Sequence, residues 1–374
     1  MPMFEHTPTR RDVLHTTATL SVAAGTLPIA AAEESEGGEF VPGERIWSYS
    51  ADGAVESGPT VVNKTVYFGC HDGTVYAIDA ENGDREWVFE TDDPPADQRY
   101  DHAGVWGEPK VIDGTVFIGA LDNHLYALDA DTGEEEWRFD TGKFVWGSPA
   151  VSNGTVYVPS RNHWVFAVDA ESGEEQWRGN VEHPAGGGVS VVDGRVHVGS
   201  YGEVNLHTFD AESGELLWKK EMNAEQCAAP AVYDETVYTM FAGEPLYAFD
   251  AETGEEQWRF GEEIGFGINE VPTVWSGTVY LPNSSGLYAV DADTGELQWD
   301  FDGRFVKMSP TIADGVLFLG SHSETYLFAI DATTGEELWR SQVYANIHSN
   351  PTVVDGVAFF GSHDGYMHAV SVFS

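Results

Sequence analysis

Short apolar runs with strand-like alternation, separated by turn residues, recur along almost the whole chain. One unit opens with the apolar run 351–354, turns at Asp355-Gly356 and continues with a second apolar run over 357–361. Asp-Gly steps predict tight hairpins, because Asp and Gly tolerate the positive φ that such turns need. A third run carries Tyr-Ala-x-Asp, as at 126–129, and a fourth carries Trp, as at 137. Each unit therefore predicts four antiparallel strands.

A tryptophan marks the fourth strand of each unit, and the turn before it reads Asp-Ala-x-Thr-Gly-Glu or a close variant. We interpret the Asp and Glu of this turn as turn structure, and not as metal ligands, because they repeat in every unit. Consecutive tryptophans of this series are spaced by 40, 50, 40, 41, 40, 41 and 40 residues. A period near 40 with strand-like content predicts a four-stranded propeller blade. The series consists of Trp47, Trp87, Trp137, Trp177, Trp218, Trp258, Trp299 and Trp339.

The two ends of the chain carry complementary incomplete units. The last unit, 351–374, offers three strands and no Trp strand, whereas 45–49 is a Trp strand without the other three. Joined, they complete one blade and leave no free sheet edge. The predicted fold is all-β: an eight-bladed β-propeller of four-stranded antiparallel blades, closed by pairing of the N-terminal Trp strand with the C-terminal strands.

The first residues read as an export signal. Thr9-Arg10-Arg11-Asp12 is a twin-arginine pattern, and the apolar run 19–32 that follows ends in three alanines. We expect a Tat signal peptide over 1–32 with cleavage after Ala32, a short linker over 33–43 and one propeller over 44–374. The alternative is a chance Arg pair on a leader. Export would place the protein outside the cell or at its surface, and no later apolar run is long enough to cross a membrane.

The charge is strongly acidic. The chain has 62 Asp and Glu residues against 18 Lys and Arg, a net charge of −44. Either the surface binds cations or a basic partner, or it is adapted to the molar salt of an extreme halophile. The acid is spread through every unit, which favours the second interpretation. A nucleic-acid partner is excluded, because a basic footprint is missing. Cys70 and Cys227 lie in different units, and we expect no bridge between them.

The pattern Ala-x-Asp-x-x-Thr-Gly-x-x-x-Trp, as at 127–137 and 248–258, resembles the tryptophan-docking motif of PQQ-like (quinoprotein-type) propellers. The resemblance covers everything after the leader and implies that each Trp of the series packs between successive blades. One branch of this family contains dehydrogenases that hold pyrroloquinoline quinone and Ca²⁺ near the propeller axis. The other contains shorter BamB-type scaffolds without chemistry.

This chain is similar to the short branch, because it has little beyond the blades and lacks the adjacent Cys pair and the haem motif. The resemblance implies a non-enzymatic scaffold that holds no cofactor and binds a protein or the cell surface, and the leader adds that this scaffold is exported. We expect a monomer. A quinone- and calcium-dependent dehydrogenase is the alternative, and a small-ligand sensor is a third possibility. The BamB role itself presupposes a bacterial outer membrane.

Strand order divides the loops between two faces. The turns after first and third strands lie on one side, the turn face, and are nearly uniform. The turns after second strands and the links between blades lie on the other, the variable face, where function usually resides. Near the axis on this face, three residues before each blade opening, are Glu56, Trp106, Trp146, Gly186, Cys227, Asn269, Lys307 and His348.

From this set we predict a candidate cofactor site. Two indoles, Trp106 and Trp146, could stack on a planar ligand, and Asn269, Lys307 and His348 could bind its oxygens. The alternative is that these side chains fill and solvate the end of the channel.

Two further features belong to the variable face. The link between Trp87 and Pro109 is ten residues longer than its counterpart, and we predict that Arg99, Tyr100 and His102 in it contact a partner. A tolerated surface excursion is the alternative. Matching turns of three consecutive blades carry His71, His322 and His363. Equivalent points on adjacent blades are roughly 9–10 Å apart, so we expect solvent-facing residues and no metal site. No catalytic residue is predicted.

Overall fold

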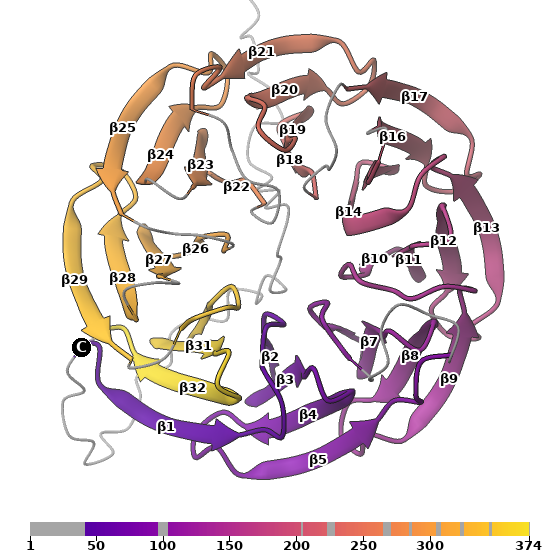
Figure 1. Ribbon diagram of the computed structural model, residues 1–374, viewed down its shortest axis with the longest axis vertical. Coiled ribbons are helices and arrows are strands. Elements are labelled where there is room, and N and C mark those ends of the chain that lie inside the picture. The colour runs from indigo at the N-terminus through magenta and orange to yellow at the C-terminus, as the bar shows by residue number, and fades with distance from the viewer. Residues whose placement is uncertain are drawn as a thin grey trace, which may run out of the picture.

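The computed structural model describes residues 42–95, 104–202, 205–222, 229–264, 271–283, 286–303, 308–321, 325–343 and 346–373. Within these ranges the strands β1 to β32 form eight four-stranded antiparallel sheets, which are arranged as the blades of a closed ring (Figure 1). The described part of the chain contains no helix, and hence no helix that could cross a bilayer. The predicted eight-bladed, all-β propeller is therefore confirmed.

Each blade runs from a short first strand near the axis to a fourth strand at the circumference (Figure 1). Blades 1 to 4 comprise β2 (Thr60–Val62), β3 (Thr65–Gly69), β4 (Thr74–Asp79), β5 (Arg85–Glu90); β6 (Lys110–Ile112), β7 (Thr115–Gly119), β8 (His124–Asp129), β9 (Glu135–Asp140); β10 (Ala150–Ser152), β11 (Thr155–Ser160), β12 (Trp164–Asp169), β13 (Glu175–Asn180); and β14 (Ala185–Val192), β15 (Arg195–Ser200), β16 (Asn205–Asp210), β17 (Leu216–Glu221). Blades 5 to 8 comprise β18 (Ala231–Tyr233), β19 (Thr236–Met240), β20 (Leu246–Asp250), β21 (Glu256–Phe260); β22 (Thr273–Trp275), β23 (Thr278–Pro282), β24 (Gly286–Asp291), β25 (Leu297–Asp302); β26 (Thr311–Ala313), β27 (Val316–Gly320), β28 (Tyr326–Asp331), β29 (Glu337–Gln342); and β30 (Thr352–Val354), β31 (Val357–Gly361), β32 (Tyr366–Ser371), with β1 (Arg45–Ser50) as the outer strand.

The ring closes through the two ends of the chain, as the sequence predicted. β1 pairs antiparallel with β32, with Trp47 opposite Ala369 and Tyr49 opposite Met367. In Figure 1 the indigo β1 lies beside the yellow β32. The Ser371 amide also donates to the Glu44 carbonyl at 2.9 Å. Every sheet thus has four strands, and blade 8 is built from both ends.

The hairpins between first and second strands have the geometry that Asp-Gly steps predict. Asp113 and Gly114 both have positive φ, 52° and 87°, which is typical of a type I′ turn. The same pair of positive φ values occurs at the equivalent turn of all eight blades, at 63–64, 113–114, 153–154, 193–194, 234–235, 276–277, 314–315 and 355–356.

Tryptophans join each blade to the next. The Trp87 indole nitrogen donates to the Ala130 carbonyl at 2.9 Å, and Gly133 packs on the same ring. Gly133 has φ +72°, and a Cβ there would lie 2.6 Å from the indole, so this turn requires glycine twice over. The same indole-to-alanine hydrogen bond is made by Trp47, Trp137, Trp177, Trp218, Trp258 and Trp299, at 3.0–3.2 Å.

The eighth tryptophan, Trp339, meets a different surface. It faces blade 8, where β1 replaces the usual fourth strand and the turn that would supply an alanine carbonyl is therefore missing. Trp339 instead packs in the apolar cluster between blades 7 and 8 and lies 6.0 Å from Phe318 between ring centroids. The apolar core lies within and between the blades, because the clusters draw residues from adjacent sheets.

Candidate functional site

An aromatic pair lies on the variable face at the entrances to blades 2 and 3. Trp106, in the link from β5 to β6, and Trp146, in the link from β9 to β10, have ring centroids 4.8 Å apart and ring planes tilted by 59°. Both indoles are half-buried. The structure thus brings together the two tryptophans that the sequence singled out.

The pair is continued by a cation that the sequence prediction missed. Arg161, in the turn between β11 and β12, places its guanidinium carbon 5.0 Å from the Trp146 ring centroid. The same carbon lies 4.9 Å from the ring centroid of Tyr201, in the turn between β15 and β16. Cation–π contacts on both rings hold the guanidinium in place. Gly186 accommodates this group, since a Cβ there would lie 2.1 Å from the Tyr201 ring.

On the other side, the aromatic pair is continued by histidines. The His71 ring stacks on Trp106 with centroids 4.7 Å apart and an interplanar angle of 18°. Its Nε2 lies 3.4 Å from Oε2 of Glu56. A row of contacting side chains therefore runs across blades 1 to 4 of the variable face, which we call the aromatic row: His71, Trp106, Trp146, Arg161 and Tyr201.

Glu56 also contacts two histidines of blade 8. Its Oε1 lies 3.1 Å from Nδ1 of His348 and 2.9 Å from Nδ1 of His363. Burial raises the pKa of Glu56, but hydrogen bonds with His348 and His71 outweigh it and hold that pKa well below its usual range. Glu56 is therefore ionised at any physiological pH.

The histidine turns differ from the expectation in one respect. Their side chains are not uniformly solvent-facing, since that of His71 is only 20% exposed whereas that of His363 is 59% exposed. His71 and His363 both face Glu56. The Glu56 side chain comes from the link between blades 8 and 1, and it is long enough to reach histidines of both blades. His322 lies outside the described residues.

The predicted cofactor residues do not form one described cluster. His348 contacts Glu56 and His363, apart from the tryptophan pair. Stacked rings lie about 3.5 Å apart, so a planar ligand held between two indoles needs about 7 Å between them. Because Trp106 and Trp146 already contact each other at 4.8 Å, a planar ligand could only stack on an outer ring face. Asn269, Lys307 and Cys227, and the partner candidates Arg99, Tyr100 and His102, lie outside the described residues.

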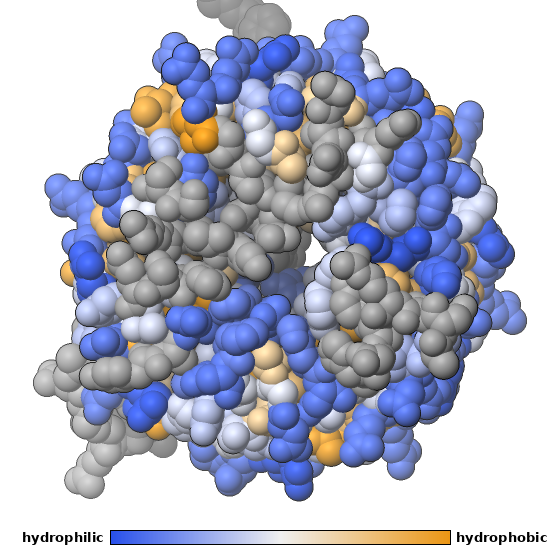
Figure 2. All heavy atoms as spheres, in the orientation of Figure 1, coloured by the Kyte–Doolittle hydropathy of each residue, from blue (hydrophilic) through white to orange (hydrophobic). Residues whose placement is uncertain are grey.

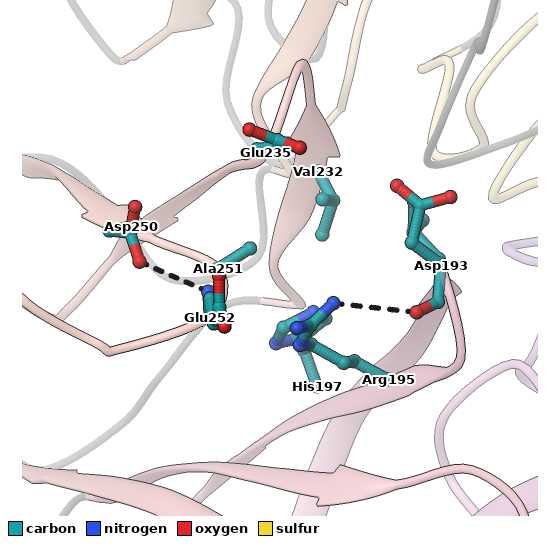
Figure 3. A pocket seen from close by; sticks show the side chains of 9 residues that line it. Asp193, Arg195, His197, Val232, Glu235, Asp250, Ala251 and Glu252 are labelled. Carbon is teal, nitrogen blue, oxygen red and sulfur yellow. Dashed lines mark hydrogen bonds between the residues drawn. The ribbon is translucent and has the colours of Figure 1, made fainter.

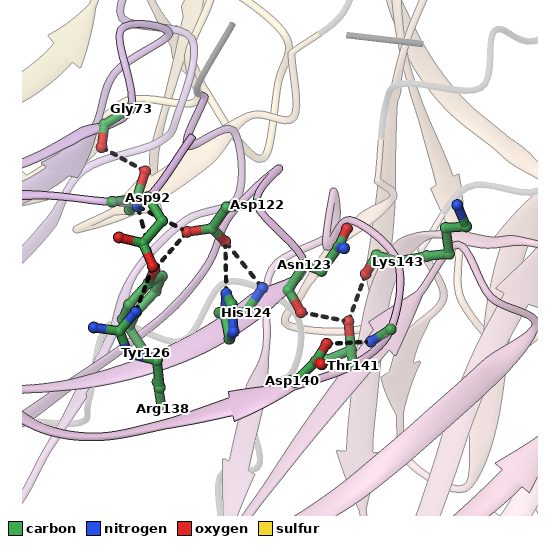
Figure 4. A network of polar contacts seen from close by, with 12 residues as sticks. Gly73, Asp92, Asp122, Asn123, His124, Tyr126, Arg138, Asp140, Thr141 and Lys143 are labelled. Carbon is green, nitrogen blue, oxygen red and sulfur yellow. Dashed lines mark hydrogen bonds and ion pairs between the residues drawn. The ribbon is translucent and has the colours of Figure 1, made fainter. Parts of the chain in front are cut away.

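The start of the long link is anchored to blade 2 (Figure 4). The Asp92 amide donates to Oδ2 of Asp122 at 3.0 Å, and Arg138 donates to the Asp92 carboxylate at 2.6 Å. The Tyr126 hydroxyl donates to the same Asp122 oxygen. Burial raises the pKa of both Asp122 and Tyr126. This network fixes the point at which the extra residues leave the blade.

A cavity of about 310 Å³ opens on the turn face between blades 4 and 5 (Figure 3). One substitution in the repeat contributes to it, because His197, which lines the cavity, is shorter than the tyrosine found at this position in other blades. In blades 1, 3, 5 and 6 a tyrosine hydroxyl of the second strand donates to the alanine carbonyl that also receives the Trp hydrogen bond, as Tyr157 does to Ala211 at 3.0 Å. Blade 4 has His197 at this position, and the shorter side chain leaves Nε2 buried without a hydrogen-bond partner beside Ala251.

Signals for these residues exist in the sequence but are weak. Arg161 is one of only 18 basic residues in an acidic chain, and His197 replaces the Tyr or Phe of other blades. Neither signal says which side chains meet, because the contacts join different blades. The outer edge of the ring is mostly hydrophilic in the view of Figure 2, as the acidic composition predicts.

Two family models match the chain. The one described as outer membrane protein assembly factor BamB matches residues 99–178 and 161–372. The one described as the β-propeller domain of glucose, ethanol and alcohol dehydrogenases matches residues 43–134. Among curated proteins, a serine/threonine-protein kinase AfsK from Streptomyces griseus is 29% identical over 150 residues. The match covers 35% of this chain and only 18% of the kinase.

Solved structures share the fold at low sequence identity. BamB from Moraxella catarrhalis superposes with a TM-score of 0.71 at 17% identity, covering 88% of this chain and 99% of that one. The computationally designed Ika8 protein gives a TM-score of 0.76 at 15% identity, covering 88% and 100%. A europium-containing methanol dehydrogenase gives 0.70 at 16%, covering 85% of both chains.

Proposed function

Because the chain belongs to the propeller family described as outer membrane protein assembly factor BamB, we propose that it is a non-enzymatic scaffold that binds a protein partner through the variable face. The aromatic row carries this proposal. Trp, Tyr and Arg are the residues that most often dominate the binding energy of protein interfaces, and Trp106, Trp146, Arg161 and Tyr201 meet in one half-buried group.

The organisation of the group suits a binding surface. Arg161 lies over two rings, so little side-chain entropy is left to lose when a partner binds. A guanidinium on a strongly acidic surface also gives a local attraction for a carboxylate or a carbonyl of the partner. We further propose, from the twin-arginine leader, that the protein is exported and meets this partner outside the cell or at its surface.

The test is site-specific cross-linking followed by affinity measurement. A photo-reactive residue at Tyr201 should capture a partner in cells, and the same residue at Arg85, exposed on the turn-face end of β5, should not. Binding of the captured partner to the purified chain should weaken at least about 30-fold in Trp146→Ala and in Arg161→Ala, an effect typical of interface hot spots. Arg85→Ala serves as the matched control and should bind normally. Equal binding by all three variants would exclude the aromatic row as the contact surface.

A quinone-dependent dehydrogenase is the second candidate, favoured by the match of residues 43–134 to dehydrogenase propellers. In this case pyrroloquinoline quinone with Ca²⁺ would stack on an outer face of the tryptophan pair in place of His71 or Arg161, which contact those rings in the structure. Titration in molar salt should then quench tryptophan fluorescence to saturation, and the quenching should be lost in Trp146→Ala and Lys307→Ala. A flat titration by the folded chain would leave the scaffold proposal standing alone.

A further inference from the structure

We propose that Glu56, His348 and His363 form a binding site for a divalent transition-metal ion such as Zn²⁺ at the junction where the ring closes. The site does not depend on the scaffold proposal, since none of the three lies in the aromatic row. The three residues come from opposite ends of the chain. Glu56 precedes blade 1, whereas His348 precedes blade 8 and His363 lies in its β31–β32 turn.

The donor atoms already converge. Oε1 of Glu56 is 3.1 Å from Nδ1 of His348 and 2.9 Å from Nδ1 of His363, and the three donors all lie within 4.8 Å of one another. In a tetrahedral zinc site with bonds of about 2.0–2.2 Å, neighbouring ligand atoms are about 3.3 Å apart. The two carboxylate-to-imidazole separations are close to that value, so side-chain adjustments that bring the two imidazole nitrogens to the same spacing would complete the site.

The two imidazoles are aligned with each other. The rings of His348 and His363 stack with centroids 4.7 Å apart and an interplanar angle of 29°, and both Nδ1 atoms face the same carboxylate oxygen. Two protonated rings at this separation would repel each other, whereas one divalent ion binds two neutral imidazoles and neutralises the carboxylate. Nε2 of His71 lies 3.4 Å from the second carboxylate oxygen of Glu56, whereas both imidazoles lie beside the first.

The donor set selects the class of ion. Ca²⁺ and Mg²⁺ prefer oxygen ligands, whereas imidazole nitrogen with one carboxylate suits zinc and its first-row neighbours. An ion can enter from solvent, because the side chain of His363 is 59% exposed. The backbone brings the same elements together, since the Val55 amide donates to the Ser362 carbonyl at 3.1 Å. A bound ion would therefore tie the N-terminal link to blade 8.

The direct test is calorimetric titration of the tag-free, chelator-treated full chain with ZnCl₂. We expect saturable binding of one ion per chain. The affinity should fall at least about tenfold in His348→Ala and in His363→Ala, because removing even a residue that only hydrogen-bonds to a metal ligand lowers metal affinity by that factor. His163→Ala is the matched control: His163 is an exposed histidine in the equivalent turn of blade 3, and its loss should leave the affinity unchanged. The control is necessary because the chain has 13 histidines.

Two further readouts distinguish coordination from loose binding. Co²⁺ should produce the visible absorption of a low-coordinate site and should quench Trp106, which stacks on His71, and this part of the quenching should disappear in Trp106→Phe. Zn²⁺ should raise the melting temperature of the wild-type chain and not that of His363→Ala. If His348→Ala fails to fold, the exposed His363→Ala decides. Absence of saturable binding, or equal affinity in wild type and His363→Ala, would overturn the proposal.

Discussion

The two faces of the propeller use the same residue types in opposite ways. On the turn face and along the blade joints, seven of the eight tryptophans of the repeat are fixed by the same hydrogen bond to an alanine carbonyl, as Trp87 is to Ala130. On the variable face, Trp106 and Trp146 contact each other and Trp146 also contacts a guanidinium, and no other described blade repeats this arrangement. The repeated residues therefore form the blades and the joints between them, which we call the frame. The residues that depart from the repeat mark the surface where a function can be located.

Histidines divide in the same way. Within the blades, His197, His207 and His368 replace aromatic residues of the repeat and are buried. Burial lowers the pKa of His197 to about 3 and the pKa of the other two to about 4. On the variable face, His71, His348 and His363 instead surround the Glu56 carboxylate. Burial within the blades therefore disfavours the protonated form of the first three histidines. The three histidines of the variable face instead have a carboxylate beside them.

The largest expected effect separates the two kinds of tryptophan. Trp87→Ala removes a buried indole and its hydrogen bond, and we expect it to lower the free energy of unfolding by about 3–5 kcal/mol. Trp146→Ala, on the variable face, should cost only about 1 kcal/mol because its ring is half-exposed. Denaturant unfolding of both variants in molar salt measures the difference. If both variants lose the same free energy of unfolding, the tryptophans of the blade joints and those of the variable face do not differ in their contribution to stability.

Glycine in the repeated turn should be the next most sensitive feature. Gly133→Ala places a Cβ 2.6 Å from the Trp87 ring at φ +72°, and we expect a loss of about 2 kcal/mol. Gly114→Ala has a similar positive φ of +87° but nothing within 4 Å, and should cost about 1 kcal/mol. The difference between the two, measured by thermal unfolding, isolates the contact with the indole. A null difference would show that only backbone strain matters.

Acid should act through the buried histidines. An unfolded histidine has its ordinary pKa of 6.5, whereas folded His207 has a pKa of about 4, so the unfolded chain binds more protons and stability falls as pH drops below 6.5. Each such histidine should lower the free energy of unfolding by about 1 kcal/mol between pH 6.5 and 5.5, because the unfolded histidine is only half protonated at pH 6.5. The variant His207→Phe copies Phe166 and Phe328 of other blades and should flatten this slope. An unchanged slope would show that other groups cause the acid sensitivity. Glu56 is not one of them in this range, because its lowered pKa affects stability only below pH 4.5, the ordinary pKa of a glutamate.

The smallest expected effect comes from replacing His197 at the joint between blades 4 and 5. His197→Tyr should restore the hydrogen bond to the Ala251 carbonyl and fill part of the cavity, raising the free energy of unfolding by about 1 kcal/mol. His197→Phe fills the same space without the hydroxyl and serves as the control. If the two variants are equally stable, the gain comes from packing and not from the added hydrogen bond.

Much of the fold could be predicted from local signals. The Asp-Gly steps predict type I′ hairpins because Asp and Gly tolerate positive φ, and the Trp series predicts the joints between blades because seven of its eight indoles bind the same turn in the next blade. The complementary incomplete units at 45–49 and 351–374 were sufficient to predict the closure. These features depend on periodicity and on residue chemistry, which a single chain displays.

The sequence also identified Trp106 and Trp146 as neighbours on one face, because equivalent positions in consecutive blades must lie near each other. It could not place Arg161 over Trp146 and Tyr201, since that contact depends on side-chain length and on the space left by Gly186. The convergence of Glu56 with His348 and His363 likewise depends on ring closure, which brings residues about 300 positions apart within hydrogen-bond distance. Periodicity determined the frame of this protein, and only the tertiary structure decided which irregular side chains meet, because those contacts cross between blades where no repeat constrains them.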